Sequence, residues 1–251
     1  MRQGCAEPVL MGEVVSAGGD ISGPKSLRGV SFEADPTGRL HVWELPEDGA
    51  SYVVAVDVGG LSDKADWSVV AVIRRGTIPE VVAQWRGHID HDLLAWKGGM
   101  IARFYNNARL VFESNTLESN TSAEEAEYQQ GALILHELYR HYRNLYRRRA
   151  PGGSRVSRIP GFHTNRQTKQ MIVTGLVAAV RDGGYVERCR EACDELDFYE
   201  RRPNGSYGAR AGRHDDMLMT RAIALHVCRE ETADDRADTE LADYLASWSN
   251  P

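Results

Sequence analysis

The feature that most constrains the fold is one short apolar run, residues 52–58, which ends at two glycines. Its sequence, YVVAVDV, is mostly β-branched and shows no alternation between apolar and polar side chains. A continuous apolar run of this length is typical of a strand that is covered on both faces of a sheet. The run therefore predicts an α/β architecture, with helices on both sides of the sheet. It carries one carboxylate near its end, Asp57.

The residues that follow continue the pattern of an α/β protein. Two further β-branched runs, residues 67–73 and 81–85, are separated by glycine and proline, and with the first run they predict a three-strand antiparallel meander. A helix is then expected over residues 91–107, and it leads into a fourth strand at residues 109–112. The fourth strand is also followed by a carboxylate, Glu113.

The second half of the chain is expected to be mostly helical, with one hairpin. We predict helices at residues 122–142, 168–181, 189–196 and 217–228, and a short strand at residues 144–149. An Asn204-Gly205 pair amid alternating residues predicts a β-hairpin over residues 198–211. Asp215 and Asp216 precede the last helix, where acidic side chains suit the positive end of the helix dipole.

By composition the chain divides into three parts. Residues 1–50 are rich in glycine, proline and charge, which is typical of a linker or an irregular lead-in. Residues 51–229 are expected to form one domain, since 251 residues with 42% hydrophobic content favour a single substantial core. Residues 230–251 are expected to form an acidic C-terminal tail.

Charge and composition limit the functional classes. The formal net charge is −6, so any binding of nucleic acid must come from local basic patches. No apolar run approaches the roughly 18–20 residues of a membrane span, and the four cysteines form no CxxC pair. We therefore expect no membrane contact, and reduced thiols in a cytosolic compartment.

Three acidic positions carry the predicted chemistry: Asp57 at the end of the first strand, Glu113 at the end of the fourth, and the pair Asp215-Asp216 at the start of the last helix. In a mixed sheet whose first and fourth strands are neighbours, the two strand ends meet. A helix packed across the sheet can bring its N-terminus to the same edge. Carboxylates gathered in this way repel one another unless a cation lies between them. Oxygen ligands select Mg²⁺ or Mn²⁺, and a two-metal site serves phosphodiester hydrolysis.

Three stretches resemble, in order and spacing, the acidic motifs of the nuclease domain of the large terminase subunit of tailed bacteriophages. They are VAVDVGGLSDKADWSVVAVI, LVFESN and GRHDDMLMTRAIAL, and the intervening NRQTKQMIVTGLVAAVRDGGY and CDELDFY are also similar to that family. The resemblance covers residues 50–228. It implies an RNase H-like fold, which is a mixed central β-sheet flanked by helices, with an auxiliary β-hairpin.

The resemblance also implies a function. The chain would be a divalent-metal-dependent endodeoxyribonuclease that cuts concatemeric viral DNA during genome packaging in the host cell cytoplasm. Its metal ligands would be Asp57, Glu113 and one or both of Asp215 and Asp216, with Asp216 preferred. Its partners would be double-stranded DNA, a small terminase subunit, a portal protein and a packaging ATPase domain. The stretch GGDISGPKS does not match the phosphate loop that such an ATPase needs.

Further residues are candidates for accessory roles, each with a purely structural alternative. Asp66 could touch a metal ion or serve a turn, Lys169 could steady a phosphate or be a solvated cation, and His214 could ligate a metal or only form a hydrogen bond. Several arginines concentrate positive charge in an acidic protein, as contacts to the DNA backbone require, although a solvated face would look the same. These candidate DNA-binding residues are Arg147, Arg148, Arg149, Arg166, Arg201 and Arg202.

Two other functions stay open at this point, and the sequence argues against a third. An RNase H-like Holliday-junction resolvase uses a similar acidic set, and a non-catalytic DNA-binding packaging module could keep the fold without the chemistry. An actin-like ATPase half also carries Asp-x-Gly after its first strand. That family needs a second phosphate loop and a glycine-rich adenosine motif, which this sequence does not contain.

Overall fold

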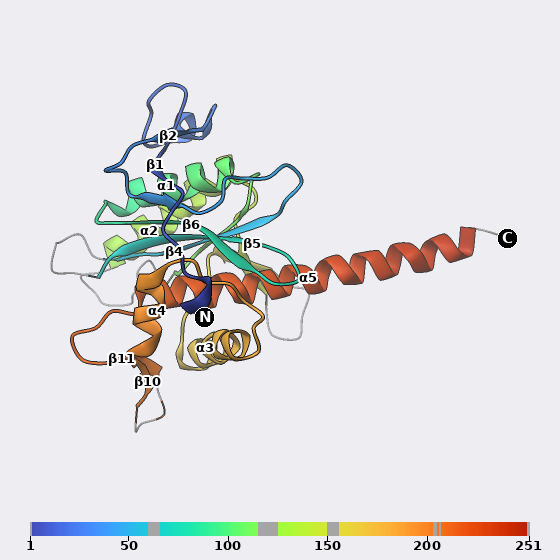
Figure 1. The fold of residues 1–251 in the computed structure, drawn as a ribbon. Coiled ribbons are helices and arrows are strands. Elements are labelled where there is room, and N and C mark those ends of the chain that lie inside the picture. The colour runs from blue at the N-terminus through green and yellow to red at the C-terminus, as the bar shows by residue number, and fades with distance from the viewer. Residues whose placement is uncertain are drawn as a thin grey trace.

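A mixed seven-stranded sheet forms the centre of the molecule (Figure 1). The structure, a computed structural model, describes residues 2–59, 66–114, 125–149, 156–202, 205 and 207–249, without the side chains of residues 125–132, 149, 156–159 and 233–249. The strand order is β2-β1-β3-β6-β5-β4-β7. The strands are β1 (Leu10–Val15), β2 (Ser31–Ala34), β3 (Leu40–Val42), β4 (Tyr52–Asp57), β5 (Ser68–Arg74), β6 (Glu80–Gly87) and β7 (Arg109–Phe112).

Strand β4 lies between β5 and β7, and its pairing places the acidic residues. Strands β4, β5 and β6 pair antiparallel in sequence order, which confirms the predicted meander. Strand β7 runs parallel to β4, with Val56 opposite Phe112. The backbone N–H of Glu113 donates to the carbonyl oxygen of Val56 at 2.8 Å. Asp57 and Glu113 therefore lie at the ends of neighbouring parallel strands, at the same edge of the sheet.

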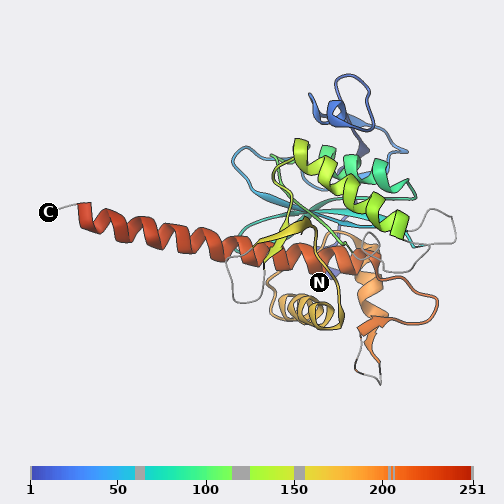
Figure 2. The ribbon, with the colours of Figure 1, turned by 180° about the vertical axis from the view of Figure 1, so that it is seen from behind.

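Helices cover both faces of the sheet (Figures 1 and 2). These helices are α1 (His91–Phe104) and α2 (Glu125–His141) on one face, and α3 (Arg166–Arg181) and α5 (Asp216–Ser249) on the other. Along β4, the side chains of Val54 and Val56 join the core on the side of α1, and those of Val53 and Ala55 join the core on the side of α5. Burial on both faces explains the continuous apolar run, and the predicted α/β class with a mixed central sheet is confirmed.

Residues 1–50 do not form the irregular lead-in that their composition predicts. They extend the main sheet, because β3 pairs with β6, and β1 pairs with both β3 and β2. Val14 and Leu40 lie in the core on the side of α1. The composition is misleading because the strands have only three to six residues. One of their glycines also has a packing role, since a Cβ at Gly12 would lie 2.1 Å from the carbonyl oxygen of Glu33.

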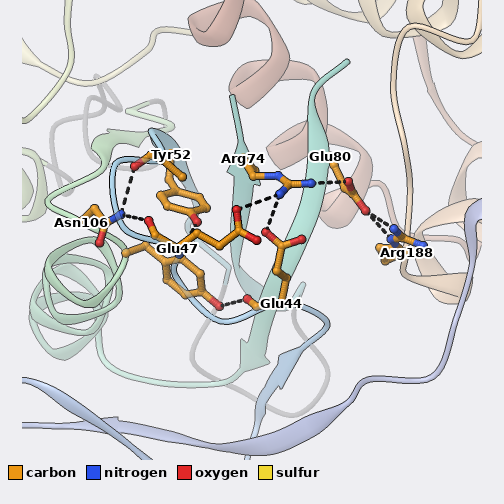
Figure 3. A network of polar contacts seen from close by, with 9 residues as sticks. Glu44, Glu47, Tyr52, Arg74, Glu80, Asn106 and Arg188 are labelled. Carbon is orange, nitrogen blue, oxygen red and sulfur yellow. Dashed lines mark hydrogen bonds and ion pairs between the residues drawn. The ribbon is translucent and has the colours of Figure 1, made fainter. Parts of the chain in front are cut away.

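A network of ion pairs closes the end of the sheet where β4 begins (Figure 3). Nη1 of Arg74 lies 2.9 Å from Oε1 of Glu44, and its Nη2 lies 3.0 Å from Oε2 of Glu80. A third carboxylate, Glu47, lies 3.4 Å from Arg74, and Arg188 also pairs with Glu80. These contacts tie the loop after β3 to β5 and β6, and they place two arginines among three carboxylates at this end of the sheet.

A buried ion pair fixes α5 against the sheet. Arg221 in α5 is 1% exposed, and its Nε lies 3.2 Å from Oε2 of Glu187, which is fully buried. Arg221 also donates to the side chain of Gln84 in β6, and Glu187 accepts from the backbone N–H of Cys189 at 2.8 Å. Each buried charge has partners, which is the condition for burying charge without a large loss of stability.

Two hairpins and a short helix complete the fold. They are β8 (Arg147–Arg149) with β9 (Val156–Pro160), β10 (Tyr199–Arg201) with β11 (Tyr207–Ala209), and α4 (Arg190–Asp197). The hairpin predicted over residues 198–211 is confirmed as β10 and β11. Gly205 has the positive φ of 79° that its turn requires. Asn204, the other residue of the predicted turn pair, lies outside the described residues.

Helix α5 is continuous over 34 residues. The acidic tail predicted at residues 230–251 is the C-terminal part of this helix as far as Ser249. Figure 1 shows that this part extends away from the sheet and helices, toward the right of the view. No helix in the described part of the chain combines the length and the apolar character needed to cross a membrane.

Candidate active site

The backbone at Gly59, just after β4, packs closely against the segment from Asp66 to Ser68. A Cβ at Gly59 would lie 2.3 Å from the carbonyl oxygen of Asp66, so the close approach of these two backbones requires glycine. The N–H of Gly59 donates to Oγ of Ser68 at 3.1 Å. The start of β5, with Asp66 just before it, is thereby held beside the end of β4.

The four carboxylates predicted as metal ligands converge at this edge of the sheet. Asp57 shares a hydrogen bond with Glu113, and the charges of Asp216 and Asp215 also act on it. Burial is the main cause that raises the pKa of Asp57 well above its ordinary value. The charge of Glu113 and the hydrogen bond to it raise this pKa further, and the two charges at the start of α5 add to the effect. Such a cluster is costly without a cation, because each negative charge opposes the others.

The N-terminus of α5 supplies two of these carboxylates. Asp215 directly precedes the helix, and its Oδ2 lies 3.1 Å from Nζ of Lys169. Asp216, the first residue of α5, is 7% exposed, and its Oδ2 accepts from the backbone N–H of Trp67 at 3.0 Å. Burial, followed by the charge of Asp66, raises the pKa of Asp216 to about 6. The helix thus presents one ion-paired and one buried carboxylate at its positive end.

Asp66 and His214, two of the predicted accessory residues, lie beside Asp216. These three residues each place one ligand atom within 4.8 Å of the other two. Nδ1 of His214 lies 2.8 Å from Oδ1 of Asp66, and this hydrogen bond is the main cause that raises the pKa of His214. Both side chains are exposed, whereas Asp216 is buried. The three residues could hold a metal ion at the rim of the cluster or form a hydrogen-bonded support, so both sequence-based alternatives stand.

Two residues that sequence reasoning does not single out also lie near the cluster. Glu195 in α4 accepts from the backbone N–H of Leu218 at 2.9 Å and so caps α5, and burial raises its pKa to about 7. Tyr199, the first residue of β10, lies next to Lys169, whose Nζ is 5.9 Å from the centre of the tyrosine ring. Both belong to the CDELDFY stretch. The family resemblance includes that stretch but gives these two residues no role, and their position near the cluster is set by the tertiary structure.

Two of the predicted DNA-binding arginines meet at the β10–β11 hairpin. The guanidinium groups of Arg166 and Arg201 both approach Gly205 in the turn. Arg202 is engaged within the hairpin, where its Nη2 donates to the carbonyl oxygen of Ala209 at 3.2 Å. Arg166 and Arg201 are exposed at this place, so they form a small basic patch.

The other predicted arginines lie on β8. The guanidinium of Arg147 lies over the ring of Tyr139, 5.1 Å from its centre, and Arg143 lies over the same ring at 4.9 Å. Arg148 is partly exposed, and the side chain of Arg149 lies outside the described residues. Positive charge therefore also gathers where α2 ends and β8 begins.

Comparisons with known proteins address the fold. No protein-family model and no curated protein sequence matches the chain. Among solved structures, the large terminase nuclease from thermophilic phage G20c with bound magnesium is similar, with a TM-score of 0.55 and 18% identity over 76% of this chain and 89% of that chain. The same nuclease with bound cobalt gives a TM-score of 0.53 and 19% identity over the same shares.

The likeness covers 76% of this chain, and at identities below 20% it concerns the fold. The predicted fold class is confirmed, including the auxiliary hairpin beside the sheet. We conclude that the chain adopts the RNase H-like fold of the large terminase nuclease domains.

Proposed function

We propose that the chain is a divalent-metal-dependent endodeoxyribonuclease, the nuclease part of a large terminase that cuts concatemeric viral DNA during genome packaging. The proposal rests on the convergence of Asp57, Glu113, Asp215 and Asp216 at one edge of the sheet. The fold shared with the phage G20c large terminase nuclease, whose crystal structures include bound magnesium and bound cobalt, supports it.

The donor set fits a hard divalent cation. Mg²⁺ and Mn²⁺ prefer carboxylate oxygens, which the cluster supplies together with one imidazole, His214, at its rim. The pKa of Asp57 is raised mainly by burial and further by the neighbouring carboxylates, and a bound cation would offset both effects by stabilising the ionised form. We propose that Asp57 and Glu113, with Asp216 or Asp215, hold two ions. When bound, these ions would supply an activated water and charge stabilisation at the phosphate.

Lys169 is the residue that we propose to steady the phosphate. Its Nζ lies 3.1 Å from Asp215, and its side chain is 29% exposed, so the ammonium group is available to a ligand at the cluster. A phosphate bound at the carboxylates would lie within reach of this group. The ammonium would then offset the negative charge that develops on the phosphate oxygens during hydrolysis. In this role Asp215 orients Lys169, in addition to its proposed role as a metal ligand.

The substrate that we propose is double-stranded DNA, held by its backbone. The patch of Arg166 and Arg201 at the hairpin and the arginines Arg147 and Arg148 on β8 would contact phosphates. Phosphate contacts position a protein on DNA without reading the base sequence. Cutting would therefore show little sequence preference. In the host cell cytoplasm, the small terminase subunit, the portal protein and the packaging ATPase domain would determine where the cut is made.

The proposal is tested by cleavage of supercoiled plasmid in the presence of Mg²⁺, Mn²⁺, Ca²⁺ or EDTA. The wild type is expected to nick and linearise the plasmid with Mg²⁺ or Mn²⁺ only. Asp57→Asn and Glu113→Gln should be inactive, whereas Asp48→Asn, at an exposed aspartate in the loop before β4, should cut normally. A wild-type protein that never cuts with either ion, even at high enzyme concentration, would contradict the proposal and favour a non-catalytic packaging module.

Two further substrates separate the nuclease alternatives. Linear duplex should be cut as readily as the plasmid, and preferential cleavage of a four-way junction would favour a junction resolvase instead.

The salt dependence of DNA binding tests the proposed phosphate contacts of the arginines. If Arg166 or Arg201 contacts a phosphate, its replacement by Gln should lower the slope of log affinity against log salt by about 0.9.

A further inference from the structure

The hydroxyl group of Tyr199 is enclosed at the edge of the carboxylate cluster without a hydrogen-bond partner in the described part of the chain. An enclosed polar group that lacks a partner lowers the stability of the fold. A phenylalanine would fill the same place without this cost. The hydroxyl therefore needs an explanation that the packing of β10 does not supply.

The contacts of the ring hold this hydroxyl in place. The ring of Tyr199 stacks on that of Tyr207 across the hairpin, with centres 6.4 Å apart and an angle of 5° between the planes. On the other side, Nζ of Lys169 lies 5.9 Å from the centre of the ring. Because Lys169 is also bonded to Asp215, the tyrosine and the lysine approach the cluster together. The side chain is thus fixed from two sides, while its hydroxyl makes no hydrogen bond in the described part of the chain.

The surroundings of the hydroxyl define what it could bind. Burial raises the pKa of Tyr199 above its ordinary value, and the charges of Asp215 and Glu113 raise it further. The group therefore stays protonated at neutral pH and acts as a hydrogen-bond donor beside the carboxylates. A donor at this place does not suit a cation. It suits an anionic oxygen that enters the cluster with the metal ions, and a DNA phosphate provides such oxygens.

We propose that Tyr199 is a phosphate-binding residue of the active site, whose hydroxyl donates a hydrogen bond to a non-bridging oxygen of the DNA phosphate held at the carboxylates. This inference rests on the proposed nuclease function. Lys169 and Tyr199 would contact the same phosphate from neighbouring elements, the ammonium from α3 and the hydroxyl from β10. The hairpin would then contribute directly to the active site and not only border it.

The test compares Tyr199→Phe with Tyr207→Phe, which removes the hydroxyl from the stacked neighbour. Steady-state cleavage of a labelled duplex with Mg²⁺ gives kcat and KM for each protein. A lost hydrogen bond to a charged phosphate should lower kcat/KM by about 10- to 100-fold in Tyr199→Phe. Tyr207→Phe should match the wild type. The melting temperature of Tyr199→Phe should not fall, because the hydroxyl makes no hydrogen bond within the part of the chain that the structure describes.

The outcomes separate this inference from the proposed function. If the wild type cuts and Tyr199→Phe cuts equally well, the inference is wrong and the proposed function stands. A wild type that does not cut overturns both. Equal losses in Tyr199→Phe and Tyr207→Phe, or a lowered melting temperature in Tyr199→Phe, would assign the hydroxyl a structural role in the hairpin and would also overturn the inference.

Discussion

Removing the charge of Asp216 should stabilise the metal-free protein while it abolishes function. The pKa of Asp216 rises from 3.8 to about 6 in the folded protein, mainly because the carboxyl group is buried. Each pKa unit corresponds to about 1.4 kcal/mol. At pH 8 the ionised carboxylate therefore lowers the free energy of unfolding by about 3 kcal/mol. Asp216→Asn removes this charge, and its amide oxygen can still accept from the N–H of Trp67.

The sign of the pH dependence follows from the direction of this pKa change. A carboxyl whose pKa is raised on folding contributes stability that is present below its unfolded pKa and is lost as pH rises through the folded pKa. The advantage of Asp216→Asn over the wild type should thus be small near pH 4, grow up to pH 6, and be complete at pH 8. For a chain of this length, 3 kcal/mol corresponds to an increase in melting temperature of roughly 6–12 °C.

Thermal unfolding followed by circular dichroism measures this effect, in EDTA and in saturating Mg²⁺. In EDTA at pH 8, Asp216→Asn should melt above the wild type, and the exposed control Asp48→Asn should not. Added Mg²⁺ should raise the melting temperature of the wild type by more than that of Asp216→Asn, because a ligand stabilises the form that binds it. An equal or lower melting temperature of Asp216→Asn in EDTA at pH 8 would refute the claim that burying the ionised Asp216 destabilises the metal-free protein.

Other predictions concern the core, the thiols and the phosphate site. Arg221→Met leaves Glu187 as an unpaired buried charge and should cost about 3–5 kcal/mol in urea unfolding; a loss below about 1 kcal/mol would contradict the buried ion pair. Sγ of Cys5 lies 3.1 Å from Sγ of Cys193, so diamide should join them in a disulfide that mass spectrometry of unreduced peptides detects, and failure to form it would argue against this contact. Lys169→Gln should lower kcat by about 100-fold at an unchanged melting temperature, and normal kcat would remove the phosphate role.

The central part of the fold could be predicted from the sequence because burial leaves a local signature there. The run from Tyr52 is apolar at every position that faces either core, and a strand of this kind requires helices on both sides. Asp57 and Glu113 each lie at the end of a predicted strand. That these strands are neighbours, and that the last helix packs across the sheet to the same edge, had to be assumed. Burial on both faces thus gave these strands a recognisable apolar pattern in the sequence, and the carboxylates at their ends defined the candidate site.

The remaining features depend on tertiary contacts that leave little local pattern. The strands within residues 1–50 are too short for a clear period, and their pairing with β6 supplies the burial that each lacks alone. Tyr199 and Glu195 acquire their surroundings from α3 and α5, which lie elsewhere in the sequence. The ion pair between Lys169 and Asp215 likewise joins residues 46 positions apart. No spacing rule could have assigned these partners.

The measurement that tests the central claim most directly is anomalous scattering from crystals soaked in Mn²⁺, because it locates the metal ions and their ligands. The account predicts two peaks roughly 3.5–4 Å apart. Asp57, Glu113 and Asp216 or Asp215 should contact them, and the peaks should be absent from Asp57→Asn crystals. No density at saturating Mn²⁺, or a single ion held by Asp66 and His214 without contact to Asp57, would contradict it.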